Sequence, residues 1–254
     1  IQGAENVTLE HAHMLYEMDE NGQLVNPDDA HTYYIHEGSV SYSDIKDVSG
    51  LVGIHLDNTL VPGGNATLNL DANLVQGLTS GIYSDGGTVN LAQGVLLKAS
   101  QLHANASTTL TGDGLYDLGE SVELGVTLGD NWTGTVRMAN VEGLSNFNLS
   151  NYAKGAGSTV AVRGLAGWLD QGTNLQGHLM LERDASAPDK AALNITAASP
   201  KTYTFAGGVT GQGDMLASYT GATATFQFKG DLSDWTGAFI SSGNEANTTS
   251  INLT

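Results

Sequence analysis

The side chains best suited to chemistry lie near the start of the sequence, where acidic residues and histidines gather. Four carboxylates, Asp19, Glu20, Asp28 and Asp29, flank a segment that begins with the turn pair Asn21-Gly22. Two carboxylates held close together share a proton and can act as acid and base on a peptide or glycosidic bond. These four residues are therefore the catalytic candidates of a hydrolase.

Three histidines in the same region offer a second kind of chemistry. His11 and His13 would share one face of a strand, and a neighbouring strand that carries His36 would complete a three-histidine zinc site. Bound zinc lowers the pKa of its water towards neutrality and so would support hydrolysis. A single His-x-His pair is a weak motif, however, and histidines of an ordinary surface or core explain the same pattern.

No cofactor is required by the sequence. Zinc at the three histidines is one option, and calcium is another, because Asp19-x-Asn21-Gly22 resembles the start of a calcium-binding loop. The distant glutamate of an EF-hand is missing. The Asp-Thr-Gly and Asp-Ser-Gly triplets of pepsin-like proteases and the Gly-x-Ser-x-Gly motif of serine hydrolases are also missing. The sequence thus does not decide whether the protein is an enzyme.

Two tryptophans occupy equivalent places in two similar motifs. Trp132 lies in NWTGTV and Trp235 lies in DWTGAF. An indole ring can stack on the apolar face of a sugar, so both are candidates for ligand binding. A tryptophan that recurs at one place in a repeat can equally close the hydrophobic core, and the sequence leaves both interpretations open.

The elements that would position these residues are short strands separated by Gly, Asn and Asp. Strand-like segments after residue 65 start about every ten to fifteen residues, a spacing typical of all-β proteins. One of them is the alternating segment 121–128. Residues 1–60, which hold five of the seven histidines, are expected to form a separate N-terminal cap, and residues 61–254 a β-repeat region.

An internal repeat organises the second of these regions. The sequence LTGDG at 110–114 and the sequence VTGQG at 209–213 each precede one of the tryptophan motifs. We predict repeat copies at about 108–207 and 208–254, the second of them truncated. Stacked parallel coils of a β-helix or solenoid explain this repeat best, and tandem β-sandwich domains are the alternative.

The pairing of TGDG with WTGTV and of TGQG with WTGAF resembles the passenger-associated β repeats of bacterial autotransporters. The blocks at 158–169 and 203–213 are similar to those in large surface proteins of gut Verrucomicrobia. The likeness covers roughly residues 60 to 254. It implies a right-handed parallel β-helix displayed outside the bacterial outer membrane, and it carries over no catalytic residue.

The composition limits the partners. Nine Lys and Arg against 27 Asp and Glu give a net charge of −18, which disfavours nucleic acid and anionic membranes. The sequence has no cysteine and no apolar segment long enough for a transmembrane helix. We therefore expect a secreted or surface-displayed module that does not insert into a membrane and binds host glycoproteins, glycans or cells. The alternative is a secreted hydrolase, a protease or glycosidase acting on mucin-type glycoproteins.

Overall fold

The protein is an all-β solenoid built from parallel stacked coils. The structure, a computed structural model, describes residues 12–14, 31–47, 50–59, 64–145, 147–168, 173–197, 199–219, 224–242 and 249–253. Strands account for 50% of the described residues, which contain almost no helix, and the coils make about nine turns. The predicted fold class is confirmed, and the parallel coils decide against tandem sandwiches.

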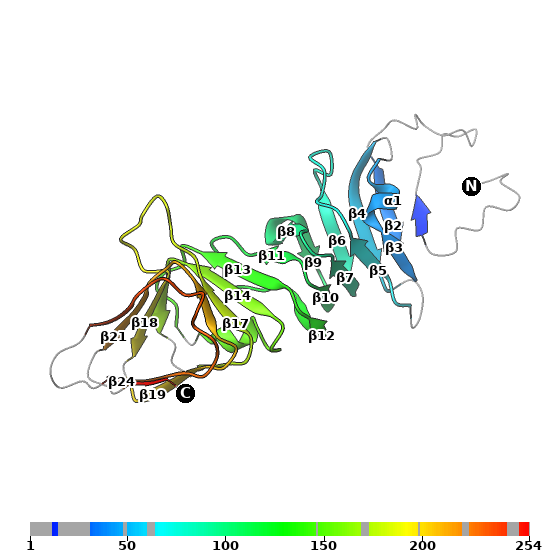
Figure 1. The fold of residues 1–254 in the computed structure, drawn as a ribbon. Coiled ribbons are helices and arrows are strands. Elements are labelled where there is room, and N and C mark those ends of the chain that lie inside the picture. Colours follow the sequence, from blue (N-terminus) through cyan, green and yellow to red (C-terminus); the bar gives the residue numbers. More distant parts are fainter. Residues whose placement is uncertain are drawn as a thin grey trace, which may run out of the picture. The chain divides into compact units, whose positions relative to one another are not determined.

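The chain divides into two compact units, of which unit 1 comprises residues 1–115 and 124–131. Ten of its strands form two sheets, in which parallel neighbours come from successive coils (Figure 1). The first sheet contains, in spatial order, β1 (Ala12–Met14), β2 (His31–Ile35), β4 (Leu51–Asp57), β6 (Gly81–Asp85) and β9 (Leu102–Ala104). The second contains β12 (Thr127–Trp132), β10 (Thr108–Gly112), β7 (Gly87–Leu91), β5 (Thr67–Leu70) and β3 (Ser39–Ser41). Shorter elements are α1 (Tyr42–Ile45), β8 (Leu96–Lys98) and the 3-10 turn η1 (Ala99–Gln101).

Unit 2 comprises residues 116–123 and 132–254, and its coils have three sides. One side contains, in spatial order, β20 (Val209–Gly211), β17 (His178–Leu181), β14 (Thr159–Arg163), β13 (Thr135–Ala139) and β11 (Leu115–Asp117). The second contains β15 (Leu165–Trp168), β18 (Leu193–Ala197), β21 (Met215–Tyr219) and β23 (Phe239–Ser242). The third contains β16 (Thr173–Leu175), β19 (Lys201–Phe205), β22 (Ala224–Phe228) and β24 (Thr249–Leu253), and the 3-10 turn η2 (Leu149–Asn151) precedes β16.

The core consists of identical positions stacked from coil to coil. Because strand residues alternate between two faces, parallel pairing in register places buried residues on top of one another. In unit 2 the buried column is Val136, Val160, Leu179 and Val209. On the third side, aromatic residues stack on the equivalent residues of the next coil. The ring centroids of Phe205 and Phe228 lie 5.2 Å apart and their planes are nearly parallel. Each coil thus buries its apolar face only because a neighbouring coil covers it.

The glycines of the repeat signature form tight corners of the coils. Gly112 and Gly211, which are equivalent in LTGDG and VTGQG, adopt φ values of +95° and +99°. A Cβ atom at Gly211 would lie 2.2 Å from the carbonyl oxygen of Leu181, and one at Gly112 would lie 2.1 Å from that of Leu91. Only glycine fits both requirements. The repeated signature is therefore explained by backbone geometry.

One expected strand is wrong in its bounds. The alternating segment 121–128 contributes only its last residues, because β12 begins at Thr127 and residues 121–126 form no regular structure. Gly125 has φ +65°, outside the range of a strand. The described strands β2 and β4, from the predicted N-terminal cap, pair in parallel with each other, and β4 pairs with β6. The cap boundary at residue 60 stays a prediction.

Candidate functional site

The sequence-predicted catalytic and metal residues lie largely outside the described part of the chain. Asp19, Glu20, Asp28, Asp29 and His11 are all outside it. The backbone of His13 is described and pairs with Tyr34, but its side chain is not. His36 is described and half-buried, with its ring centroid 6.0 Å from that of Tyr34. The carboxylate hydrolase and the three-histidine zinc site therefore stay predictions.

The two tryptophans differ in how they pack. Trp132 is only 4% exposed, so its ring offers no face to a ligand. Trp235 is half-buried, donates its indole N–H to the carbonyl oxygen of Gly213 at 3.0 Å and stacks on Phe228. Gly213 belongs to the repeat signature, so the second tryptophan motif is fixed to the glycine corner of a neighbouring coil. These contacts favour the structural interpretation of both tryptophans.

Unit 1 carries a surface that the sequence did not reveal, which we call the ring row: Tyr34, His55, Tyr83 and His103. The four residues occupy successive strands β2, β4, β6 and β9 and are paired in register. Each of them has a chain neighbour that is buried in the core, such as Ile54 beside His55, so alternation along each strand directs the rings to the outer face. A single ladder position therefore presents an aromatic or imidazole ring in four consecutive coils.

The rings of the ring row contact one another along its whole length. Ring centroids lie 5.0 Å apart for Tyr34 and His55, 6.4 Å for His55 and Tyr83, and 5.0 Å for Tyr83 and His103. The planes are tilted by 31° to 64°, so no ring is fully covered by a parallel neighbour. Tyr83 is 41% exposed, and His103 is exposed as well. Because the rings contact one another, their side chains have little freedom to lose when a ligand binds, so the entropy cost of binding is small.

Two carboxylates border the ring row. Asp85 accepts a hydrogen bond from, or forms an ion pair with, His55, with Oδ2 2.7 Å from Nε2. Asp57, in register with Asp85 on the adjacent strand, is 9% exposed and accepts hydrogen bonds from the backbone N–H and hydroxyl of Thr59. Burial acts to raise the pKa of Asp57, but the Thr59 hydrogen bonds and the nearby His55 and His36 outweigh it and lower the pKa. Asp57 is therefore a structural carboxylate and Asp85 an accessible one.

No metal centre is formed by the residues that the structure describes. Within them, no group of three or more His, Asp and Glu side chains is arranged to hold a metal ion. The histidines of the ring row alternate with tyrosines, which places a ring between His55 and His103. The ring row therefore offers ring faces for stacking and polar atoms for hydrogen bonding.

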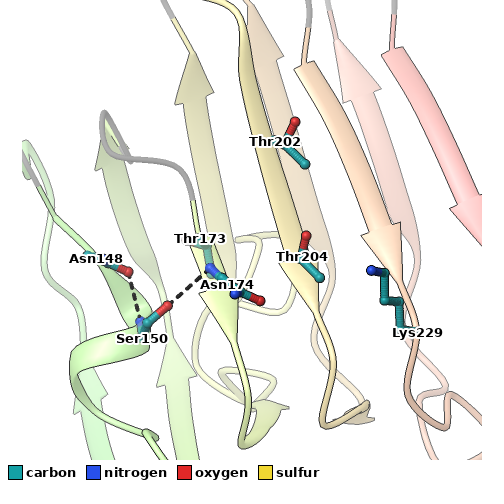
Figure 2. A pocket seen from close by; sticks show the side chains of 7 residues that line it. All are labelled: Asn148, Ser150, Thr173, Asn174, Thr202, Thr204 and Lys229. Carbon is teal, nitrogen blue, oxygen red and sulfur yellow. Dashed lines mark hydrogen bonds between the residues drawn. The ribbon is translucent and has the colours of Figure 1, made fainter.

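Unit 2 carries a second surface feature, which we call the polar hollow (Figure 2). It has a volume of about 530 Å³. Its lining includes Asn148, Ser150, Asn174, Thr202, Thr204 and Lys229. Figure 2 shows that these side chains come from η2 and the residue before it, from β16 and β19, and from the residue that follows β22. The hollow therefore lies over the third side of the unit 2 coils and is distinct from the ring row.

Sequence reasoning missed both surfaces for the same reason. The members of the ring row are separated by unequal intervals in the chain, and so are those of the polar hollow. Only the register of the coils brings them together. An outward-facing ring within each strand segment was the one available signal, and it becomes informative only after the strands are aligned.

No known protein family, curated protein sequence or solved structure matches the chain. The likeness to autotransporter passenger repeats therefore stays a prediction. Within the described part of the chain, no helix has the length and apolar character needed to span a membrane.

Proposed function

We propose that this chain is a secreted or surface-displayed solenoid module that binds glycoconjugates through the ring row. The observation that carries the proposal is the alignment of four outward-facing rings, one from each of four consecutive strands, beside an accessible carboxylate. A flat sheet face with these groups is chemically suited to a saccharide, whose rings have apolar faces and hydroxyl edges.

The exposed part of the Tyr83 ring supplies the apolar contact. In the ring row, Tyr83 lies between His55 and His103. A sugar C–H face placed against Tyr83 would remove apolar area from water on both molecules, which is favourable. A glycan that crosses the strands would meet the next ring one strand spacing, about 4.8 Å, further along.

Asp85 supplies the polar contact. One of its oxygens is held by His55 at 2.7 Å, which fixes the carboxylate beside the rings. The other oxygen can accept hydrogen bonds from sugar hydroxyls, and such charge-assisted bonds are the stronger kind. Because Asp57 and Asp85 make this edge of the sheet acidic, the ring row favours neutral, hydroxyl-rich sugars over anionic ones.

The acidic and cysteine-free composition supports an extracellular location. A net charge of −18 keeps a protein soluble and lowers nonspecific binding to nucleic acid and anionic membranes. The chain also reaches its fold without disulfides, through coil stacking alone. These properties fit an extracellular module that contacts a glycan-rich surface.

The proposal is tested by glycan-array binding of the purified chain and of three single variants. Tyr83→Ala should weaken binding to neutral glycans by about tenfold, the effect of losing one favourable aromatic contact of about 1.4 kcal/mol. Tyr83→Phe keeps the ring and should bind almost like the wild type. Val75→Ala, at another exposed apolar residue of unit 1, serves as the control.

Two outcomes would overturn this function. The first is an array without any bound neutral glycan. The second is binding that Tyr83→Ala leaves unchanged while the variant has the same unfolding midpoint as the wild type. In either case the ring row would only stabilise the stacking of the coils.

A further inference from the structure

The polar hollow of unit 2 is lined mainly by groups that donate hydrogen bonds. The side-chain oxygen of Asn148 accepts from the backbone N–H of Ser150 at 2.9 Å, and that of Asn174 accepts from the Gln176 amide at 2.9 Å. The hydroxyl oxygen of Ser150 accepts from the backbone N–H of Asn174 at 3.1 Å (Figure 2). Each of these three acceptors already has one donor. The amide N–H groups of both asparagines and the Ser150 hydroxyl hydrogen remain as donors.

Lys229 adds a positive charge to these donors. It is exposed at the end of β22, and among the described residues it takes part in no ion pair. Asp231, the nearest acid along the chain, accepts instead from the backbone N–H and hydroxyl of Ser233. The chain has only nine Lys and Arg residues. A lysine without an ion-pair partner, placed beside a hollow lined by hydrogen-bond donors, attracts an anion to that hollow.

Hydroxyl groups occupy the strand side of the hollow. Thr202 and Thr204 project from β19, and the Thr204 hydroxyl donates to Gln227 at 3.1 Å, which leaves its oxygen free to accept. Thr173 also lines the hollow, but it is only 5% exposed and pairs in register with the buried Tyr203, so its side chain faces the core. The outward-facing hydroxyls of Thr202 and Thr204 are therefore the ones that a ligand in the hollow can reach.

From this arrangement we infer that the polar hollow binds an anionic saccharide unit. Its carboxylate or sulfate contacts Lys229 and the Asn174 amide, and its hydroxyls contact Thr202 and Thr204. A volume of about 530 Å³ lies within the range of small-molecule sites. The site differs from the ring row in its unit, in its lack of aromatic rings and in the charge of its ligand. It does not depend on the ring row, and each can fail without the other.

Calorimetric titration of the whole chain with defined monosaccharides tests the inference. Glucuronic acid and glucose 6-sulfate represent the two anionic groups, glucose is the neutral match, and sodium acetate and sodium sulfate are the anions without a sugar. We expect at least one acidic sugar to bind about tenfold more tightly than glucose, since a hydrogen bond to a charged group is stronger than one between neutral groups. The preferred acidic sugar identifies the anionic group.

Three variants assign the binding to the hollow. Lys229→Gln removes the charge and should weaken binding of the preferred acidic sugar by about tenfold. Asn174→Asp keeps the acceptor for Gln176 but places a carboxylate in the hollow, and it should abolish binding by like-charge repulsion. Lys154→Gln, at an exposed lysine of unit 2 outside the hollow, is the charge-matched control and should bind like the wild type.

The inference is overturned if neither acidic sugar binds more tightly than glucose. It is also overturned if acetate or sulfate alone binds as tightly as the acidic sugars, because the hollow would then be an anion site without sugar recognition. Equal losses in Lys229→Gln and Lys154→Gln would overturn it as well, because binding would then follow net charge. Tyr83→Ala should leave acidic-sugar binding unchanged, which separates this site from the ring row.

Discussion

At the scale of single residues, the described surface of unit 1 assigns different roles to two aspartates on adjacent strands. Asp57 is buried and directed towards Thr59, whereas Asp85 is partly exposed and holds His55 at the ring row. Chemically identical side chains thus serve the fold in one case and a candidate binding surface in the other. The two side chains leave the same face of the sheet, and the difference follows from the hydrogen-bond partner of each, Thr59 for Asp57 and His55 for Asp85.

The lowered pKa of Asp57 makes stability depend on pH. A carboxyl group whose pKa is lower in the folded than in the unfolded chain stabilises the fold above its unfolded pKa of about 3.9. That contribution is lost as the pH falls through the folded pKa. We therefore expect the free energy of unfolding to fall less steeply below about pH 4 in Asp57→Asn than in the wild type. Urea unfolding at a series of pH values measures this slope.

At neutral pH the Asp57→Asn variant should be less stable by about 1 kcal/mol, because a neutral amide accepts weaker hydrogen bonds from Thr59 than a carboxylate does. Asp113→Asn, at an exposed aspartate of unit 1, is the control. If the wild type and Asp57→Asn had parallel profiles in acid, Asp57 would not be a source of acid lability.

At the scale of elements, the sequence indicated short strands but not their register. The strands expected after residue 65 include the observed Ala224–Phe228, and the recurring TG-x-G signature marks a repeated corner. The strand expected at 121–128 failed because the backbone of Gly125 interrupts an apolar alternation that continues past it. To predict the ring row and the polar hollow, the length of each coil must be known. The loops differ in length, so no local sequence pattern gives the coil length.

The corner at Gly211 gives a test of the coil geometry. Gly211→Ala should lower the free energy of unfolding by at least about 2 kcal/mol, since backbone strain of this kind alone costs about 1–3 kcal/mol. The added Cβ would also collide with the Leu181 carbonyl, from which it would be 2.2 Å away. Denaturant unfolding measures the loss.

Two other glycines separate the contributions of strain and collision. Gly94 has φ +81° but open space around it, so Gly94→Ala should cost only about 1 kcal/mol of strain. Gly155 has neither a positive φ nor a close neighbour, so Gly155→Ala should be almost neutral. If all three substitutions had equal effects, the geometry of the corner would not explain why glycine recurs in the repeat signature.

At the scale of the whole molecule, the chain is a solenoid whose two units each present one candidate saccharide surface. The ring row of unit 1 combines rings with carboxylates, and the polar hollow of unit 2 combines donors with a lysine. Stacked coils suit this use, because a residue type placed at one ladder position is repeated at a fixed spacing along the sheet. The scaffold therefore turns short sequence elements into extended surfaces.

The most direct test of saccharide binding at the ring row is an aromatic proton–carbon NMR titration with a neutral glycan that the array identifies as a ligand. We expect the ring signals of Tyr34, His55, Tyr83 and His103 to shift together with one dissociation constant, while the buried Tyr116 and Tyr203 of unit 2 stay unchanged. Saturating binding that leaves all four ring-row signals in place would contradict the proposed function.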